Sequence, residues 1–364
     1  MNSRSLKPDE IELVLKHRAS QVNLDNINSN SALAEYCAER GIDMKTIVSV
    51  KHWQNMSGEP RFSIVTKDET VTSDVLFEQV HSFISEHAPH YKKQKYKPPT
   101  KNNTNHLLVI NPADIHIGKY ASSKETRSVD YNTEIAVKQV IEGVFGLLKK
   151  AQGFHINRIL FCIGNDVLHV DNVYASTTKG THQDTDGKWW EHYDKAIAMY
   201  VKCVEILKEI APVDCIHSMS NHDYQSGYHL AKTLEAWFRN CDDVTVDANA
   251  SHRSYYKYGQ SLIGLEHGDG AKMDKLPLLM AQEKPKEWAK STYRYWYLHH
   301  LHHKVKHKWR DAKDFIGVTV EYLRSPSAAD SWHSRKGFTG SPKAVEAFVH
   351  EFDKGQVARL THFF

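Results

Sequence analysis

The chain has 364 residues, of which 40% are hydrophobic and 25% are charged. This length and composition indicate a globular protein with a sizeable core and, by length, two domains. The formal net charge of +3 excludes a strongly basic or acidic protein and does not by itself indicate a nucleic-acid partner. The sequence has no apolar run of about 18 residues and no signal peptide, so we expect a cytoplasmic protein that does not enter a membrane.

Two residue types narrow the expected chemistry. The five cysteines are odd in number and lack CxxC spacing, which predicts reduced, mostly buried thiols. The 24 histidines are unusually numerous. Histidine is the commonest transition-metal ligand, so a metal site is expected if these residues gather where strands end.

Residues 1–90 are expected to form a small, mostly helical module. Helices are predicted over 32–40, 43–53 and 75–87, and a strand is predicted over 61–67. Gly41 would end the first helix and Asp43 would cap the second. Two short helices joined in this way are typical of a helix-turn-helix, with the strand as its wing. The sequence leaves two readings open, a DNA-binding module or one that only packs or forms an oligomer.

Residues 91–105 are rich in lysine, proline and asparagine and contain almost no aliphatic side chains. This composition predicts an extended basic linker between two domains. Lys92, Lys93 and Lys95 would contact phosphates if the partner is DNA. The alternative reading is a solvated tether.

From residue 106 onward, predicted strands alternate with helices. Strands are predicted over 107–110, 158–163, 213–217, 253–258, 261–265, 293–298 and 315–320, and helices over 133–151, 190–210 and 228–239. Alternation followed by a strand-rich part indicates an α/β fold, with helices around a central sheet or pair of sheets.

Polar side chains follow five of these strands, at the point where each strand ends. The clusters are Asp114-Ile115-His116, Gly164-Asn165-Asp166, Asn221-His222-Asp223, His267-Gly268-Asp269 and His299-His300-Leu301-His302. Ligand sites in α/β sheets lie beyond the carboxyl ends of the strands, so we expect these clusters to converge. Two carboxylates, an amide oxygen and four imidazoles can hold two divalent metal ions, with one carboxylate bridging them. This mixture suits Mn, Fe or Zn better than Mg, which prefers oxygen ligands.

In this order, the motifs Asp-x-His, Gly-x-Asp, Asn-His-Asp, His-Gly and His-x-His resemble the calcineurin-like metallophosphoesterase superfamily. The resemblance covers about residues 106–320. It implies a layered β-sandwich flanked by helices, with a catalytic domain over 106–325 and a C-terminal extension over 326–364. Carried over residue by residue, it implies one metal ion held by Asp114, His116, Asp166 and His302. It implies a second held by Asp166, Asn221, His267 and His300.

The resemblance also implies catalytic roles for two residues. His222 would protonate the leaving oxygen or stabilise the transition state, and Asp223 would orient it. Three positions depart from the usual family pattern. Asn165 lies inside the usual Gly-Asp pair, and Ser220 and His299 stand where glycines usually lie. Because glycine allows tight turns, these departures concern loop geometry and remove no ligand. In the last motif, His299 or His303 are alternatives to the chosen ligands.

The run Asp166-Val167-Leu168-His169 indicates the substrate class. Protein Ser/Thr phosphatases of the superfamily have Asp-Arg-Gly here, whereas this run resembles the Asp-Leu-Phe-His run of its DNA double-strand-break repair nucleases. By that similarity His169 would help hold a phosphodiester, and we expect Trp189 and Trp190 to stack bases.

The leading hypothesis is therefore a Mn-dependent nuclease, an exonuclease or endonuclease with DNA as its partner. Two alternatives stay open. One is a phosphodiesterase or phosphatase acting on a small substrate such as a cyclic nucleotide. The other is a DNA-binding scaffold without activity.

Overall fold

The computed structural model describes residues 30–54, 60–66, 104–301 and 312–364. The chain divides into two compact units, residues 1–81 and 82–364. Within the described ranges, no helix combines the length and the apolar character needed to cross a bilayer.

The described part of the N-terminal unit is a helix with a β-hairpin. α2 (Asn30–Glu39) agrees with the first predicted helix. Asp43 caps only the short 3-10 turn η2 (Met44–Thr46), after which the chain extends as β1 (Ile47–Gln54). β1 pairs antiparallel with β2 (Pro60–Thr66), which confirms the predicted strand over 61–67.

The predicted helix over 43–53 is therefore wrong, and with it the helix-turn-helix that it would form with the first helix. Ile47 and Val50 are β-branched, so they lose side-chain freedom in a helix and fit a pleated strand. The predicted helix over 75–87 and the linker residues Lys92, Lys93 and Lys95 lie outside the described residues.

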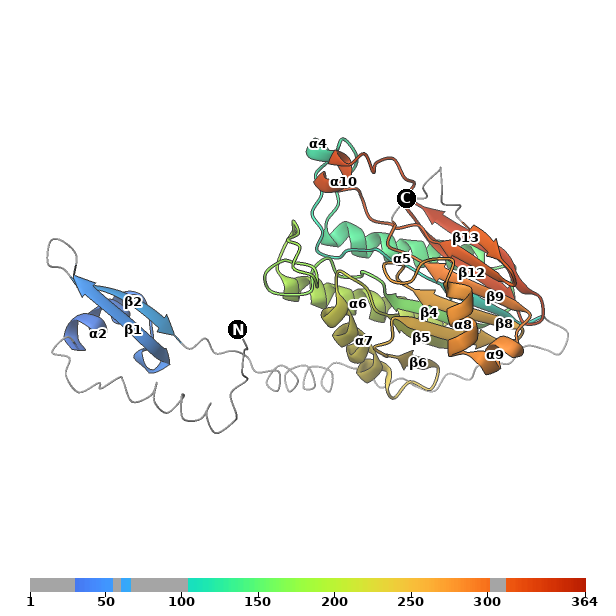
Figure 1. Ribbon diagram of the computed structural model, residues 1–364, viewed down its shortest axis with the longest axis horizontal. Helices are drawn as coiled ribbons and strands as arrows, with labels where there is room; N and C mark the ends of the chain where they lie inside the picture. Colours follow the sequence, from blue (N-terminus) through green and yellow to red (C-terminus); the bar gives the residue numbers. More distant parts are fainter. Residues whose placement is uncertain (1–29, 55–59, 67–103, 302–311) are drawn as a thin grey trace, which may run out of the picture. The chain divides into compact units, whose positions relative to one another are not determined.

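A six-stranded sheet forms the centre of the C-terminal unit (Figure 1), in the order β13-β12-β3-β4-β5-β6. Its strands are β3 (His106–Ile110), β4 (Ile156–Gly164), β5 (Val213–Ser218), β6 (Val244–Asp247), β12 (Ala344–Glu351) and β13 (Gly355–Phe363). β3 to β6 run parallel, whereas β12 is antiparallel to both its neighbours. One face is covered by α5 (Thr133–Lys150), α6 (Trp189–Lys208) and α7 (Tyr224–Phe238).

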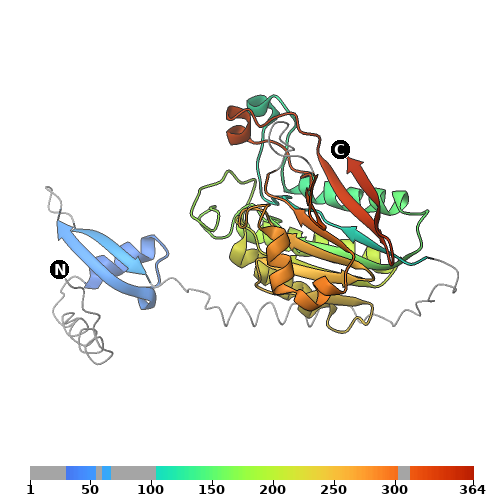
Figure 2. The same ribbon diagram turned by 45° about the vertical axis from the view of Figure 1, so that its right-hand side comes forward.

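A five-stranded sheet packs on the other face of the central sheet, as the turned view also shows (Figure 2). Its order is β10-β11-β9-β8-β7. The strands are β7 (Arg253–Tyr258), β8 (Ser261–Glu266), β9 (Tyr293–Leu298), β10 (Ala312–Phe315) and β11 (Val318–Tyr322). The outer face of this sheet packs against α8 (Leu276–Glu283) and α9 (Pro285–Ala289). The unit is therefore α/β, with two facing sheets and helices outside them.

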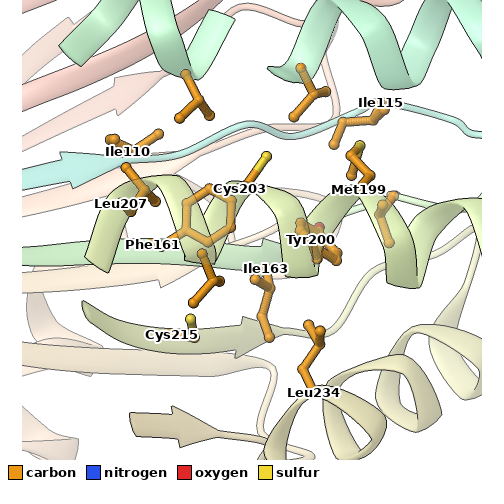
Figure 3. Packing of buried hydrophobic residues seen from close by; sticks show 14 of the residues in the cluster. Ile110, Ile115, Phe161, Ile163, Met199, Tyr200, Cys203, Leu207, Cys215 and Leu234 are labelled. Carbon is orange, nitrogen blue, oxygen red and sulfur yellow. The ribbon is translucent and has the colours of Figure 1, made fainter. Parts of the chain in front are cut away.

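The alternation of side chains along the central strands explains these layers. On β3, Leu108 and Ile110 pack beneath the helices, whereas Leu107 and Val109 pack against the second sheet. Successive residues of a strand point to opposite faces, so an uninterrupted apolar strand can serve two cores. Figure 3 shows the helix side of this core, with Phe161 of β4 packed against α6.

The C-terminal part of the chain completes the central sheet. β12 pairs with β3, with Ala347 opposite Ile110, and Phe348 stacks on Tyr297 of the second sheet with ring centroids 4.1 Å apart. The prediction that residues 326–364 form an extension outside the domain is therefore wrong for these strands. The pairing of β12 with β3 joins segments that lie far apart in the chain, and no local pattern in the sequence marks it.

We expect Phe348→Ala to lower the free energy of unfolding by about 3–5 kcal/mol, because it would leave a cavity between the two sheets. Urea denaturation followed by circular dichroism measures this change. Phe145, which is 53% exposed on α5, provides the control. Phe145→Ala should change the free energy by less than about 0.5 kcal/mol. Equal stability of the Phe348→Ala and wild-type proteins would contradict the core position of β12.

Candidate metal centre

The loops that follow β3, β4, β5, β8 and β9 meet at one edge of the two sheets. Seven non-glycine residues in the described ranges have positive φ, and five of them lie shortly after the end of one of these strands. They are Asp114 (φ 51°), His116 (φ 53°), Asn165 (φ 55°), Asp166 (φ 59°) and His300 (φ 71°). Left-handed backbone costs about 1–3 kcal/mol at such a residue and persists only where the surroundings impose it. The loops are thus held in costly conformations at residues predicted to bind metal or next to them.

Backbone hydrogen bonds join the loop after β3 to the loop after β4. Asp114 N donates to Asn165 O at 2.8 Å, and His116 N donates to Asp166 O at 3.0 Å. Gly164 allows β4 to end close against β5, because its φ is +87° and a Cβ there would lie 2.5 Å from the Ser218 carbonyl oxygen. The Asp-x-His and Gly-x-Asp motifs therefore form one backbone framework.

Asp114, His116 and Asp166 form one candidate cation site. All three side chains are buried, and their ligand atoms lie within 4.8 Å of one another. The Asp114 carboxylate accepts a hydrogen bond from His300 N at 3.0 Å, and its carbonyl accepts one from Ser325 Oγ at 2.7 Å. Burial raises the pKa of the Asp114 carboxyl to about 7. A cation bound beside this carboxylate would favour its charged form.

Asp166, His267 and His300 form a second group, with ligand atoms within the same distance of one another. Asn221 Oδ1 lies 2.8 Å from His267 Nε2, and Asp166 Oδ2 lies 3.1 Å from the same nitrogen. Ligand atoms that surround one cation octahedrally at about 2.1 Å lie about 3 Å from their neighbours. Asp166 belongs to both groups, as expected of a bridging carboxylate.

The protonation states of Asp166 and His267, which face each other and are both buried, also fit a cation site. Burial alone would raise the pKa of Asp166, but His267 and His222 outweigh it and hold the pKa below its ordinary value. Burial opposes the charged form of His267, yet Asp166 raises the pKa of that ring to about 9. His267 Nδ1 is buried without a hydrogen-bond partner among the described residues. A positive charge is therefore required beside Asp166, and either a proton on His267 or a cation provides it.

The structure brings His300 rather than His299 into the second group. His299 N donates to His267 O at 2.9 Å, so this residue ties the loop after β9 to the loop after β8. Its side chain is buried, and burial holds the pKa of the ring well below its ordinary value. His302 and His303 lie outside the described residues, so the fourth ligand of the first cation stays a prediction.

His222 and His169 lie beside the first group. His222 Nδ1 is 2.9 Å from the His169 carbonyl oxygen, which can only accept, so Nδ1 carries the proton and Nε2 is left for other partners. The two rings stack with centroids 5.4 Å apart at 18°. Ring nitrogens of both residues lie within 4.8 Å of one on His116. Burial lowers the pKa of His169 well below its ordinary value, so its ring is neutral at neutral pH.

Asp223 links the loops after β4 and β5. The hydrogen bonds of its carboxylate go to these loops and not to the ring of His222. Its carboxylate accepts hydrogen bonds from Ser220 Oγ at 2.5 Å and from Leu168 N at 2.9 Å. Ser220 Oγ in turn accepts one from Asp166 N at 2.7 Å. The carbonyl of His169 therefore orients His222, in place of the predicted Asp223. Ser220, at the position where the superfamily that the motifs resemble usually has glycine, holds Asp166 in position.

Trp189 and Trp190 begin α6, and they are 38% and 50% exposed. The loop before them is joined to the loop that carries Asp114 and His116, because Asp186 N donates to Gly118 O at 3.1 Å. The two rings meet edge to face with centroids 5.8 Å apart. Base stacking by these residues stays a prediction.

Three residues around the centre carry no motif and were not predicted. Ser325 contacts Asp114, as described above. Lys119 is buried, with Nζ 3.1 Å from Asp330 Oδ2 and 3.3 Å from Ser327 Oγ. A buried lysine nearly always has a partner of opposite charge. In the sequence, only the position of Lys119 shortly after the Asp-x-His motif indicated that it lies near the centre. Nothing in the local sequence marks Asp330 or Ser325, because their partners lie far away in the chain.

Comparison with known proteins adds no family assignment: no protein-family model matches the chain, and no curated protein matches it.

We expect Asp166→Asn to remove at least one of two bound Mn²⁺ ions, because an amide cannot bridge two cations as a carboxylate does. Isothermal titration calorimetry gives the number of ions bound per chain. Asp353→Asn, in the exposed turn between β12 and β13, is the control and should bind as the wild type does. Unchanged stoichiometry in Asp166→Asn would contradict a shared bridge.

The affinity for Mn²⁺ should rise with pH between about 6 and 9. The folded-state pKa values of Asp114 and His267 are raised, to about 7 and about 9, so protons compete with the cation below these values. The competition fades as the pH passes each value. Titrations at several pH values, in buffers of different ionisation enthalpy, measure both the affinity and the protons released. A pH-independent affinity without proton release would contradict the assignment of these ligands.

Proposed function

We propose that the chain is a two-metal-dependent phosphodiesterase that hydrolyses nucleic acid, with DNA as its substrate. The observation that carries the proposal is the position of Asp166 in two ligand groups at once, with His222 beside them. The order of the five motifs and the two facing sheets support a layered fold of the calcineurin-like metallophosphoesterase type.

The donor set fits a pair of divalent cations. One would be held by Asp114, His116, Asp166 and His302, and the other by Asp166, Asn221, His267 and His300. A bound pair of this kind polarises a phosphoryl oxygen and supplies a nucleophilic water near neutral pH. Mixed carboxylate and imidazole ligands favour Mn, with Fe, Zn or Mg as alternatives.

His222 is the candidate general acid. The oxygen that leaves phosphorus gains negative charge, which a nearby proton donor stabilises. With Nδ1–H held by the His169 carbonyl, Nε2 would donate a proton to the leaving oxygen when the His222 ring carries both protons. The backbone N–H of His222 donates to Asp166 Oδ1 at 2.8 Å, so the residue is fixed directly to the proposed bridge.

The loop after β4 favours a phosphodiester over a phosphomonoester. Val167, Leu168 and His169 follow Asp166, so this run has no arginine to bind the second charge of a monoester. Lys119 cannot take that role freely, because its ammonium group is buried against Asp330. A neutral His169 suits a group with a single negative charge.

The proposal is tested with purified protein, Mn²⁺ and end-labelled single- and double-stranded DNA. We expect the wild type to shorten the labelled strands. His222→Ala should bind the same number of cations but hydrolyse DNA and bis-p-nitrophenyl phosphate about 10²–10⁴-fold more slowly. His229→Ala, a half-buried histidine of α7, is the control and should keep the wild-type rate.

Other outcomes would support the alternatives. Turnover of bis-p-nitrophenyl phosphate and cyclic nucleotides, with DNA left intact, would indicate a small-substrate enzyme. DNA binding without turnover under any metal would indicate a scaffold. An unchanged rate in His222→Ala would refute its role as the acid.

A further inference from the structure

Two short helices from distant parts of the chain form a projection next to the metal centre. α4 (Ser123–Thr126) and α10 (Ser331–Arg335) lie side by side in both ribbon views (Figures 1 and 2). We call residues 120–130 and 330–338 the α4–α10 ridge. Trp332 and Phe338 are 51% and 42% exposed on it, with ring centroids 5.8 Å apart. Exposed aromatic rings grouped in this way are typical of an interaction surface.

The ridge also presents positive charge. Its exposed basic side chains are those of Lys124, Arg127, Arg335 and Lys336. Of its three acidic residues, Asp330 pairs with the buried Lys119, whereas Glu125 and Asp130 are exposed, so the four exposed basic side chains outnumber the two exposed carboxylates. Positive charge around exposed aromatic rings is complementary to a strand with negative phosphates and flat bases.

The base of the ridge is fixed to the metal-binding loop. Lys119 N donates to His116 O at 3.0 Å, and Lys119 Nζ reaches Asp330, the residue that caps α10. The same ammonium group also donates to the hydroxyl of Ser327, in the segment that leads into α10. The buried lysine therefore joins a candidate cation ligand to the start of the exposed aromatic helix.

We propose that the α4–α10 ridge binds the single-stranded stretch of nucleic acid beside the bond that is cleaved. Trp332 stacks a base, Phe338 supports that ring, and the four basic side chains bind the flanking phosphates. A single strand fits because its bases expose their faces, whereas a duplex hides them between neighbouring base pairs. This inference rests on the proposed function. It adds that the ridge makes the enzyme prefer single-stranded over duplex nucleic acid.

Binding is measured separately from hydrolysis, by fluorescence anisotropy of a labelled oligothymidylate in EDTA. We expect Trp332→Ala to raise the Kd by at least about 5-fold, with Trp332→Phe closer to the wild type. The double variant Arg335→Ala/Lys336→Ala should weaken binding and reduce the dependence of log K on log salt by about 1.4, for two lost phosphate contacts on a single strand. Phe145→Ala is the matched exposed aromatic control and should bind as the wild type does.

Hydrolysis of bis-p-nitrophenyl phosphate separates this inference from the proposed function. The ridge variants should keep the wild-type rate on this small diester while their KM for oligonucleotides rises. A wild type inactive on both substrates would refute the proposed function, yet the binding assay would still test the ridge. Wild-type affinity in both Trp332→Ala and the double arginine–lysine variant would overturn the ridge proposal, as would equal weakening of blunt duplex binding.

Discussion

The C-terminal unit depends on the stabilisation of one buried carboxylate, that of Asp166. The carboxylate oxygens face the backbone N–H of His222 and the ring of His267. The backbone N–H of Asp166 donates to Ser220 Oγ. A buried anion is costly unless hydrogen bonds and an opposite charge surround it. Loops from three strands of two different sheets must therefore converge on this residue, and the left-handed backbone of Asp166 is maintained by that convergence.

The same constraint bears on the three positions at which the motifs differ from the superfamily that they resemble. Where a glycine would only permit a tight turn, Ser220 adds a hydroxyl that links Asp166 to Asp223. His299 contributes a backbone bond to the loop of His267. Asn165, in the left-handed region, offers its carbonyl to Asp114 N. Of these contacts, only that of Ser220 is made by the substituted side chain, whereas His299 and Asn165 bond through their backbones.

Much of the centre could be predicted because parallel strands place their carboxyl ends at one edge, so polar residues after β4 and β5 had to lie close together. The helices α5 and α6 could be predicted for a different reason, because apolar residues recur at helical spacing within each segment. Contacts between distant segments escaped this reasoning. Asp330 pairs with Lys119 and Ser325 with Asp114, and no spacing in the sequence marks either pair. At β1, a capping signal at Asp43 was outweighed by β-branched residues that favour a strand.

The position of β12 bears on the order in which the protein is assembled during translation. β3 leads directly to Asp114, but one of its neighbours in the sheet, β12, leaves the ribosome only after nearly the whole domain has been made. Until then β3 has an open edge, and Asn111 N lacks its acceptor, Glu346 O. The nascent chain therefore contains all five predicted cation-binding motifs well before the strand that leads to Asp114 acquires its second neighbour.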